Sequence, residues 1–313
     1  MSQAGDPLFL QLQAGRREFL ALVESVRPDL HRYCARMTGS IAEGEDVVQE
    51  TLARAYYALP ELEELPALRP WLFQIAHNRA LDHLRRYDRR MAEPLEVIEE
   101  TAASQGDDPE SALGREQAIR AAVSRFLDLP PVQRSCVVLM DVLGHSLEEI
   151  AGLLGISVPA VKAALHRGRT RLRALNLGAT ALPPPPPSDT IVQYTALFNA
   201  RDWDGVRALL ADDVKLDLVS RFRRAGRRQV GNYFTNYDER FDWYLVPAWL
   251  DGREVLAVTR DPQPAAGAPA PSGQFSLPSG YFIELSLQGG RIVAIRDFRY
   301  VPYIAREAVF QRP

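Results

Sequence analysis

The chain has 313 residues, of which 46% are hydrophobic and 25% are charged, and its formal net charge is −3. This composition is that of a folded globular protein, which excludes a disordered or fibrous chain, and the length predicts two or three domains. No stretch approaches the roughly 20 apolar residues of a membrane helix, and no basic segment precedes an apolar one at the start, so we expect neither a membrane protein nor a secretion signal.

Cysteine usage and charge distribution restrict the function further. Cys34 and Cys136 have no partner at metal or redox spacing, which favours a reducing cytoplasm and predicts no metal site. Residues 69–90 carry six arginines and two aspartates, and residues 160–173 carry five basic residues and no acid. Residues 92–116 between them hold eight acids and one arginine. Two basic blocks of this kind suit a polyanion such as nucleic acid.

The first half of the chain is predicted to be helical. Apolar residues recur at helical spacing over 45–59, and Pro70 opens a second helix at a favoured early position. Residues 91–114 contain prolines, glycine and acids, and are typical of a flexible linker. Two further amphipathic helices are predicted over 113–126 and 132–143.

Residues 146–175 form a helix-turn-helix pattern. Ser146 and Glu149 predict a capping box at the start of the first helix, and Gly155 predicts its left-handed end. Ser157 is placed to cap a second helix, whose exposed face would carry basic side chains as a recognition helix does. The alternative is an amphipathic hairpin with a solvated basic face.

Five prolines, Pro183 to Pro187, predict a semi-rigid spacer before a unit of mixed structure. Helices are predicted over 190–200, 203–210 and 231–237, and strands over 214–218, 254–259, 281–287 and 291–299. Gly289 and Gly290 predict a hairpin turn between the last two strands. Residues 261–280 are expected to form a long loop.

Three segments of the first half together resemble one family. Residues 42–51 (AEGEDVVQET), 69–86 (RPWLFQIAHNRALDHLRR) and 146–173 (SLEEIAGLLGISVPAVKAALHRGRTRLR) are similar, in this order, to motifs of the extracytoplasmic-function sigma factors of bacterial RNA polymerase. The resemblance covers about the first 175 residues. It implies two all-α domains, sigma region 2 and sigma region 4, with promoter DNA and the RNA polymerase core as partners and no catalytic residue, metal or cofactor.

The resemblance also assigns roles to particular residues. It implies that Asp46, Gln49 and Glu50 contact the clamp of the polymerase β′ subunit, although a solvated polar face is the alternative. The second segment would read the −10 promoter element, with Trp71 and Phe73 as conceivable stacking platforms. Its polar face carries Asn78, Arg79, Asp82, His83, Arg85 and Arg86.

The recognition helix would read the −35 element as duplex DNA. Lys162 and His166 are expected to reach base edges, whereas the arginines are expected to hold phosphates. Pro159 stands in the stretch where the family usually has a small-Thr-Val sequence, so no promoter preference carries over. The residues predicted to contact DNA here are Ser157, Ala160, Lys162, His166, Arg167, Arg169, Arg171 and Arg173.

The remainder of the chain resembles a second family. Residues 196–218 are similar to the start of SnoaL-like α+β domains, in which two helices precede a curved sheet that forms a cone. All five histidines precede the proline run, which excludes a histidine-dependent catalyst in this part. A pocket for an unknown small ligand could be lined by Asp217, Tyr237, Trp249, Tyr281, Glu284 and Asp297, although surface carboxylates and core aromatics are the alternative.

Together these patterns predict a sigma factor that initiates transcription in the cytoplasm and is regulated in cis by its last domain. One alternative is a helix-turn-helix regulator that never binds polymerase, and another is a SnoaL-like enzyme or ligand sensor tethered to DNA. The expected organisation is a region 2 domain (8–91), an acidic linker (92–114), a region 4 domain (115–177), a proline-rich linker (178–188) and a SnoaL-like domain (189–313).

Overall fold

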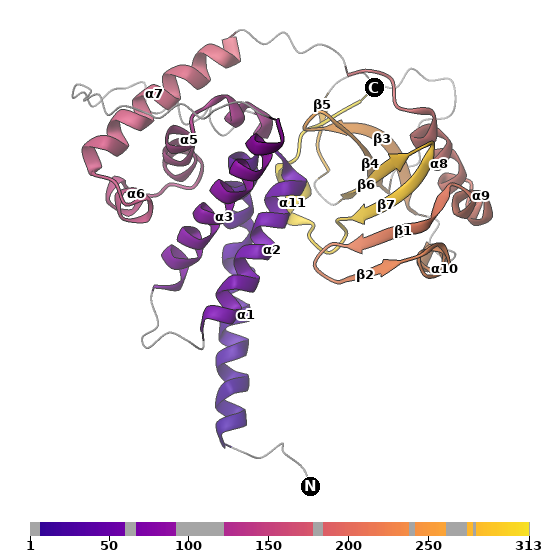
Figure 1. The fold of residues 1–313 in the computed structure, drawn as a ribbon, viewed down its shortest axis with the longest axis horizontal. Coiled ribbons are helices and arrows are strands. Elements are labelled where there is room, and N and C mark those ends of the chain that lie inside the picture. The colour runs from indigo at the N-terminus through magenta and orange to yellow at the C-terminus, as the bar shows by residue number, and fades with distance from the viewer. Residues whose placement is uncertain are drawn as a thin grey trace. The chain divides into compact units, whose positions relative to one another are not determined.

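The contacts within the computed structural model divide the chain into two units, Met1–Ala179 and Thr180–Pro313. We call these the helical unit and the sheet unit and describe each by itself (Figure 1). The acidic linker predicted over 92–114 lies outside the residues that the structure describes. The described residues are 7–59, 67–91, 122–177, 184–237, 242–260, 274–277 and 280–312.

Three helices begin the helical unit: α1 (Pro7–Thr38), α2 (Ile41–Ala58) and α3 (Leu68–Met91). The chain turns sharply between α1 and α2 because Gly39 adopts a φ of +72°. Ser40 then caps α2, its side chain accepting a hydrogen bond from the backbone N–H of Glu43 at 3.3 Å. The apolar face predicted for α2 is confirmed, since Val47, Val48 and Ala55 are buried.

The rest of the helical unit contains shorter helices. The predicted helix over 113–126 lies largely outside the described residues, and its described end belongs to a 3₁₀ helix. The predicted helix over 132–143 is confirmed, with a wider π-helical turn in its second half. In order, the elements are η3 (Val123–Asp128), α5 (Pro131–Val137), η4 (Val138–Val142), α6 (Leu147–Leu154) and α7 (Val158–Leu177).

Helices α6 and α7 form the predicted helix-turn-helix. The capping box is present: Glu149 accepts a hydrogen bond from the N–H of Ser146 at 2.8 Å, and Ser146 accepts one from the N–H of Glu149 at 3.2 Å. Gly155 ends α6 with a φ of +67°. The two helices meet at 101°, within the range of about 90–120° that helix-turn-helix pairs adopt.

One hydrophobic core joins the two halves of the helical unit, α1 to α3 and η3 to α7. Buried side chains come to it from α1, α2, α3, α5, η4, α6 and α7. Polar groups are buried within it. The Tyr33 hydroxyl lies 2.7 Å from Nδ1 of His77 on α3 and donates to Ser135 of α5 at 3.1 Å. Arg134 of α5 donates to the carbonyl of Met37 at 2.5 Å. These bonds satisfy buried groups that would otherwise destabilise the core.

The buried thiols of Cys34 and Cys136 are free. Burial raises the pKa of the Cys136 thiol to about 12, and burial also raises that of Cys34. Both therefore stay protonated and unreactive at neutral pH. Among the described residues no single helix is both long and apolar enough to cross a membrane, and α6 with α7 passes that test only as a bent pair.

The sheet unit is built around one mixed, eight-stranded sheet, whose strands follow the order β2-β1-β7-β6-β4-β3-β8-β5 (Figure 1). Strands β1 and β7 pair in parallel, and the other neighbours pair antiparallel. The strands are β1 (Leu210–Leu218), β2 (Phe222–Ala225), β3 (Tyr244–Leu250), β4 (Arg253–Thr259), β5 (Gln274–Phe275), β6 (Tyr281–Gln288), β7 (Arg291–Asp297) and β8 (Phe310–Gln311).

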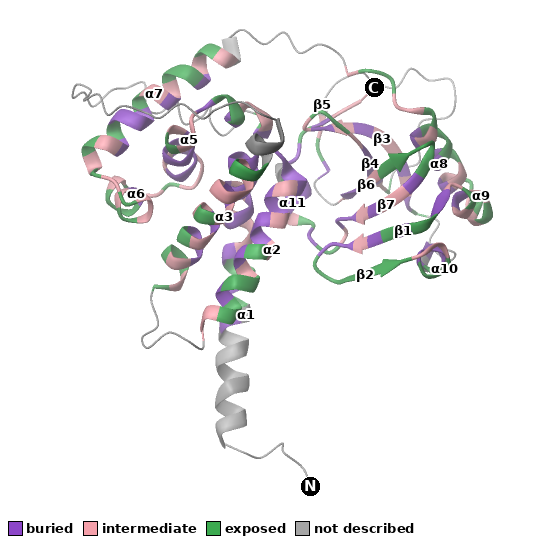
Figure 2. Ribbon diagram, viewed as in Figure 1, coloured by how far each residue is buried: buried purple, intermediate pink, exposed green. Residues whose placement is uncertain are grey.

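One face of the sheet is covered by helices, whereas the other is covered over β4 and the start of β6 but is exposed at Lys215 and along β2 (Figure 2). On one face the helices preceding the sheet and those between β2 and β3 pack on Leu216, Ile283 and Ile295. On the other face Phe282 stacks on Phe298 with ring centroids 4.4 Å apart. The helices of this unit are α8 (Asp189–Asn199), α9 (Trp203–Ala208), α10 (Arg227–Gly231), η5 (Asn232–Tyr237) and α11 (Tyr303–Glu307).

The predicted fold class, an all-α part followed by an α+β part, is therefore confirmed. The Gly289–Gly290 turn is confirmed as well, since both residues have positive φ. Strand β3 escaped prediction because Pro247 interrupts its sequence. That strand tolerates the proline since its edge away from β4 pairs with β8 only at Trp249, so little of the ladder is lost.

The end of the proline run is fixed to the sheet unit. The indole of Trp249 donates to the carbonyl of Pro185 at 3.0 Å, and the Ser188 hydroxyl donates to Glu254 of β4 at 2.9 Å. The backbone N–H of Ser188 also donates to Glu254. Residues from Pro185 onward therefore belong to the sheet unit rather than to a free spacer.

Candidate nucleic-acid interface

The exposed face of α7 carries the residues predicted to read duplex DNA. Val161 and Leu165 are buried, whereas Lys162 and His166 are exposed on the opposite side of the same turns. Ser157 is exposed and caps α7 by accepting a hydrogen bond from the N–H of Ala160 at 3.3 Å. The first turns of α7 are thus presented to solvent, as major-groove reading requires.

Arg169 differs from its neighbours on α7. Its guanidinium donates two hydrogen bonds to the carboxylate of Asp141, at 2.9 Å and 2.5 Å. These hydrogen bonds raise the pKa of Arg169. The Asp141 carboxylate is only 1% exposed, so it depends on this partner. We therefore correct the expectation that Arg169 holds a phosphate: it fastens α7 to the helix that precedes α6.

Arg171 is exposed, and Arg167 and Arg173 are half-buried. Among the described residues Arg171 makes no ion pair, which leaves its charge available to a phosphate. Gly168 has a packing reason, because a Cβ there would lie 2.7 Å from a methyl group of Val137. The glycine lets α7 approach α5 closely.

The residues predicted to read the −10 element lie along α3. Asn78, Arg85 and Arg86 are exposed, whereas Arg79 pairs with Asp82 at 2.7 Å. His83 lies 3.2 Å from Glu43 of α2. Of the two conceivable platforms, Trp71 is half-buried, but Phe73 is fully buried against Tyr33 and His145. Phe73 is therefore a core residue.

The three residues predicted to contact polymerase share one face of α2. Glu50 is exposed, and Asp46 and Gln49 are half-buried. Beneath them Glu45 is buried and pairs with Arg27 of α1. Glu45 is thus structural, although it stands within the same acidic motif.

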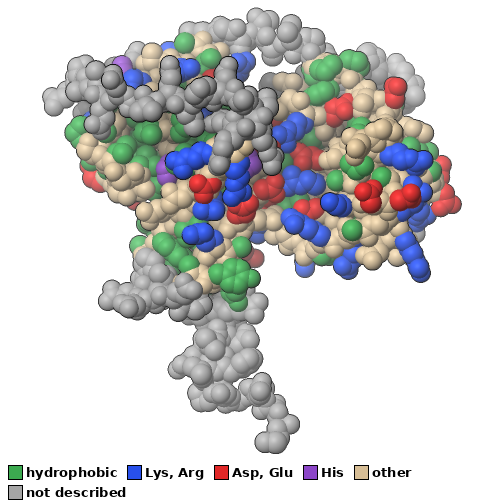
Figure 3. Space-filling view, viewed as in Figure 1, with side chains coloured by type: hydrophobic (Ala, Val, Ile, Leu, Met, Phe, Trp, Pro, Cys, Tyr) green, Lys and Arg blue, Asp and Glu red, His purple; other side chains and the backbone are tan. Residues whose placement is uncertain are grey.

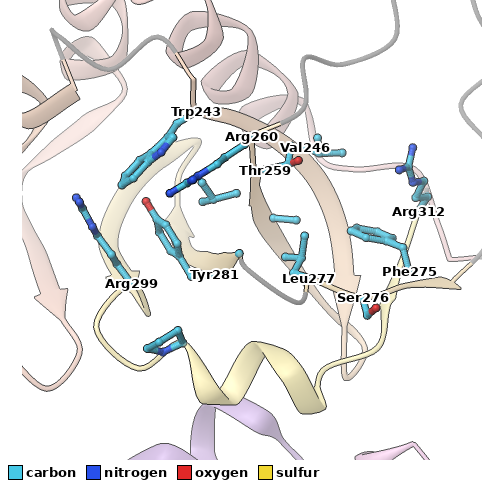
Figure 4. Close-up of a pocket in the computed structure, with 14 residues that line it drawn as sticks. Trp243, Val246, Thr259, Arg260, Phe275, Ser276, Leu277, Tyr281, Arg299 and Arg312 are labelled. Atoms are coloured by element: carbon cyan, nitrogen blue, oxygen red, sulfur yellow. The ribbon is translucent and has the colours of Figure 1, made fainter.

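The pocket predicted in the sheet unit is corrected at five positions: Tyr237 and Asp297 are buried and do not line it, and three other residues make contacts elsewhere. Asp217 pairs with Arg223 at 3.3 Å, Glu284 pairs with Arg296 at 3.2 Å, and Trp249 bonds the proline run. Strand pairing sets the two carboxylates opposite arginines of neighbouring strands. None of them lines the pocket of about 630 Å³ that the unit contains, whereas Tyr281 does (Figure 4).

Behind Tyr281 lies a chain of buried hydroxyl groups. The Tyr281 hydroxyl is 3.4 Å from that of Tyr237, which is 2.7 Å from that of Tyr233. Tyr233 donates to the carboxyl of Asp297 at 2.5 Å, and the backbone N–H of Arg299 donates to its other oxygen at 2.9 Å. Burial raises the pKa of Asp297 and of all three tyrosines.

Sequence reasoning missed two groups of residues. Tyr33, His77 and Ser135 meet from helices that are far apart in the chain, and no local pattern marks them. The arginines that line the pocket likewise come from separate strands and turns. Figure 3 shows other basic side chains over β1 and β2, where every residue of β2 is exposed, as suits an edge strand.

Among the described residues no cluster of three or more His, Cys, Asp or Glu could hold a metal ion. The helical unit presents exposed cations on α3 and α7 and exposed acid on α2.

Comparison with known proteins agrees with this description. The Sigma-70 region 2 family matches residues 22–90, and the Sigma-70 region 4 family matches residues 119–172. The ECF RNA polymerase sigma factor SigW of Bacillus subtilis is 31% identical over 172 residues, which cover 52% of this chain and 91% of SigW. The chain belongs to the ECF RNA polymerase sigma factors.

A longer relative and a solved structure extend the comparison. The ECF sigma factor SigG of Mycobacterium tuberculosis is 34% identical over 214 residues, and the match spans 60% of this chain but only 58% of SigG. The crystal structure of Mycobacterium tuberculosis ECF sigma factor SigJ is 22% identical, with a TM-score of 0.35, and covers 89% of this chain and 95% of SigJ.

Proposed function

We propose that this protein binds the RNA polymerase core and directs it to promoters. The observation that carries the proposal is the helix-turn-helix of α6 and α7, which presents exposed cations within the segment matching sigma region 4. In this proposal Lys162 and His166 read base edges of the −35 element, and Arg167, Arg171 and Arg173 hold phosphates. Asn78, Arg79, Asp82, His83, Arg85 and Arg86 serve the −10 element.

The α2 face with Asp46, Gln49 and Glu50 is proposed to bind the clamp of the polymerase β′ subunit. Its half-buried and exposed polar groups support this role, since the apolar side of the same helix is already buried in the core. A DNA-binding regulator that never engages polymerase has no need of such a face. The function would place the protein in the cytoplasm, as its cysteine usage predicts.

The sheet unit is proposed to regulate the helical unit in cis and to bind a small ligand rather than to catalyse a reaction. The pocket lining supports binding, because its one group suited to proton transfer is the Tyr281 hydroxyl, whose pKa burial raises. We retain the domain boundaries predicted from the sequence, except that residues from Pro185 onward are held on the sheet unit.

Two assays with purified core polymerase test the function. Full-length protein and a chain ending at residue 187 are each incubated with the core, and co-purification and promoter-dependent transcription are measured. We expect both to bind the core and their transcription to differ, because only one carries the regulatory unit. Absence of core binding by both chains would overturn the sigma function, and equal transcription at every concentration would overturn regulation in cis.

A further inference from the structure

We propose that the pocket of the sheet unit binds an organic anion with an aromatic or other apolar body. The pocket opens between β3, β4 and β6 and the short strands β5 and β8 (Figure 4). Its volume of about 630 Å³ is within the range of small-molecule sites. The proposal rests on the proposed binding of a small ligand by the sheet unit, but not on polymerase or promoter binding, because the ligand is measured directly.

The charge of the lining indicates an anion. Three of the lining residues are arginines, Arg260, Arg299 and Arg312, and none is a carboxylate. Arg260 approaches Asp242 only at 4.0 Å, and neither Arg299 nor Arg312 makes an ion pair within the described part of the chain. Three guanidinium groups around one hollow repel one another, and a bound anion removes that repulsion.

Two of the guanidinium groups are oriented by aromatic rings and not by ion pairs with carboxylates. Arg299 lies 4.3 Å from the ring centre of Trp243, and Arg312 lies 5.0 Å from that of Phe275. Such stacking orients the planar group and leaves its N–H donors available for a carboxylate, which it binds in a two-pronged manner. Figure 4 shows the end of Arg260 beside the Tyr281 hydroxyl, Arg299 on the other side of Tyr281, and Arg312 beside Phe275 elsewhere on the rim.

The remaining lining is apolar and accounts for the body of the ligand. Val246, Val258, Leu277 and Pro302 line the pocket together with the rings of Phe275 and Tyr281. A small inorganic anion would leave this surface in contact with water, whereas an aromatic carboxylate would cover it.

Tyr281 belongs to both the apolar and the polar lining of the pocket, through its ring and its hydroxyl group. Since Tyr233 donates to Asp297, and Tyr237 donates toward Tyr233 or Asp297, the hydroxyl hydrogen of Tyr281 can be given to a ligand. Asp297 is itself buried behind the tyrosines and does not line the pocket, so its charge is separated from a bound anion.

Isothermal titration of the full chain with naphthalene-2-carboxylate and with neutral naphthalene-2-carboxamide tests the proposal. We expect the carboxylate to bind at least about ten-fold more tightly, since charge-assisted hydrogen bonds contribute about that much. Arg299→Gln is expected to remove most of this difference while changing carboxamide affinity less than about two-fold. The control Arg228→Gln alters an exposed arginine of α10 outside the pocket and should change neither affinity.

Equal affinity for the two compounds, no binding of the carboxylate at millimolar concentration, or unchanged carboxylate affinity in Arg299→Gln would each overturn the proposal. Thermal melting of each variant confirms that it is folded before the titration. Core binding and transcription are measured in separate assays, so failure of this proposal is distinguishable from failure of the proposed function.

Discussion

His77 illustrates how a single buried side chain couples the stability of the helical unit to pH. Burial lowers its pKa from an ordinary value of about 6.5 to about 4. The unfolded chain therefore binds a proton more readily, so stability is lost as the pH falls below about 6.5 and the loss is complete near 4. Burial lowers the pKa of His145 as well, which acts in the same direction.

We expect the free energy of unfolding to fall by up to about 2 kcal/mol between pH 7.5 and pH 5 on account of His77. His77→Asn keeps a polar group near the Tyr33 hydroxyl but cannot titrate, so its stability should fall less over the same range. Urea unfolding of both proteins at several pH values measures the difference. Parallel curves for the two proteins would contradict this assignment.

At the scale of one element, α7 combines a structural arginine with DNA-binding ones. Arg169→Ala is expected to cost about 3 kcal/mol of stability, because it leaves the buried Asp141 carboxylate unpaired. Replacing both partners, by Arg169→Met with Asp141→Leu, should recover most of that loss. The exposed Arg171→Ala is the matched control, with a change within about 0.5 kcal/mol in chemical unfolding.

DNA binding by Arg171→Ala and by Lys162→Ala separates phosphate contact from the reading of bases. Arg171→Ala should lower the slope of log affinity against log salt by about one unit with little change in base preference. Lys162→Ala should change promoter preference, since Lys162 is exposed in the first turns of α7. A variant at Arg171 that altered base preference and kept the wild-type slope would reverse these roles.

The elements that could be predicted from the sequence are those with local signals. Ser146, Glu149 and Gly155 lie within one short segment, so the helix-turn-helix was predictable in detail. The pocket was not, because Arg312 reaches it only through the pairing of β8 with β3 and β5. The same holds for Asp141, whose role appears only once α7 brings Arg169 beside it.

For the whole helical unit, the shared core has a functional consequence. The −10 and −35 elements lie about 25 base pairs apart, which is about 85 Å of B-DNA. Helices α3 and α7, of 24 and 20 residues, extend only about 36 Å and 30 Å. Phe73 of α3 contacts His145 just before α6, with ring centroids 5.3 Å apart, so under the proposed function we expect the two halves to separate when both elements are read.

A reversible crosslink tests this separation. A Cβ at Gly39 would lie 2.3 Å from Cγ of Leu127, so a disulfide between Gly39→Cys and Leu127→Cys needs only a small local shift. The φ of +72° strains any side chain at position 39, and the single variant Gly39→Cys measures that strain by itself. We expect oxidation to reduce promoter-dependent transcription at least about ten-fold and a reductant to restore it. Each single variant serves as a control, and full activity of the crosslinked protein would show that both elements are read without separation.

The core that joins the two halves also gives the helical unit a response to temperature. Separation would expose apolar side chains such as Phe73, which contacts His145, and Phe126, which lies against Arg36 of α1, and this exposure raises the heat capacity. Contacts of this kind weaken on cooling, because their driving force near room temperature is the entropy of water. The balance between joined and separated halves therefore shifts toward separation in the cold and toward closure on moderate warming, with no ligand or partner involved.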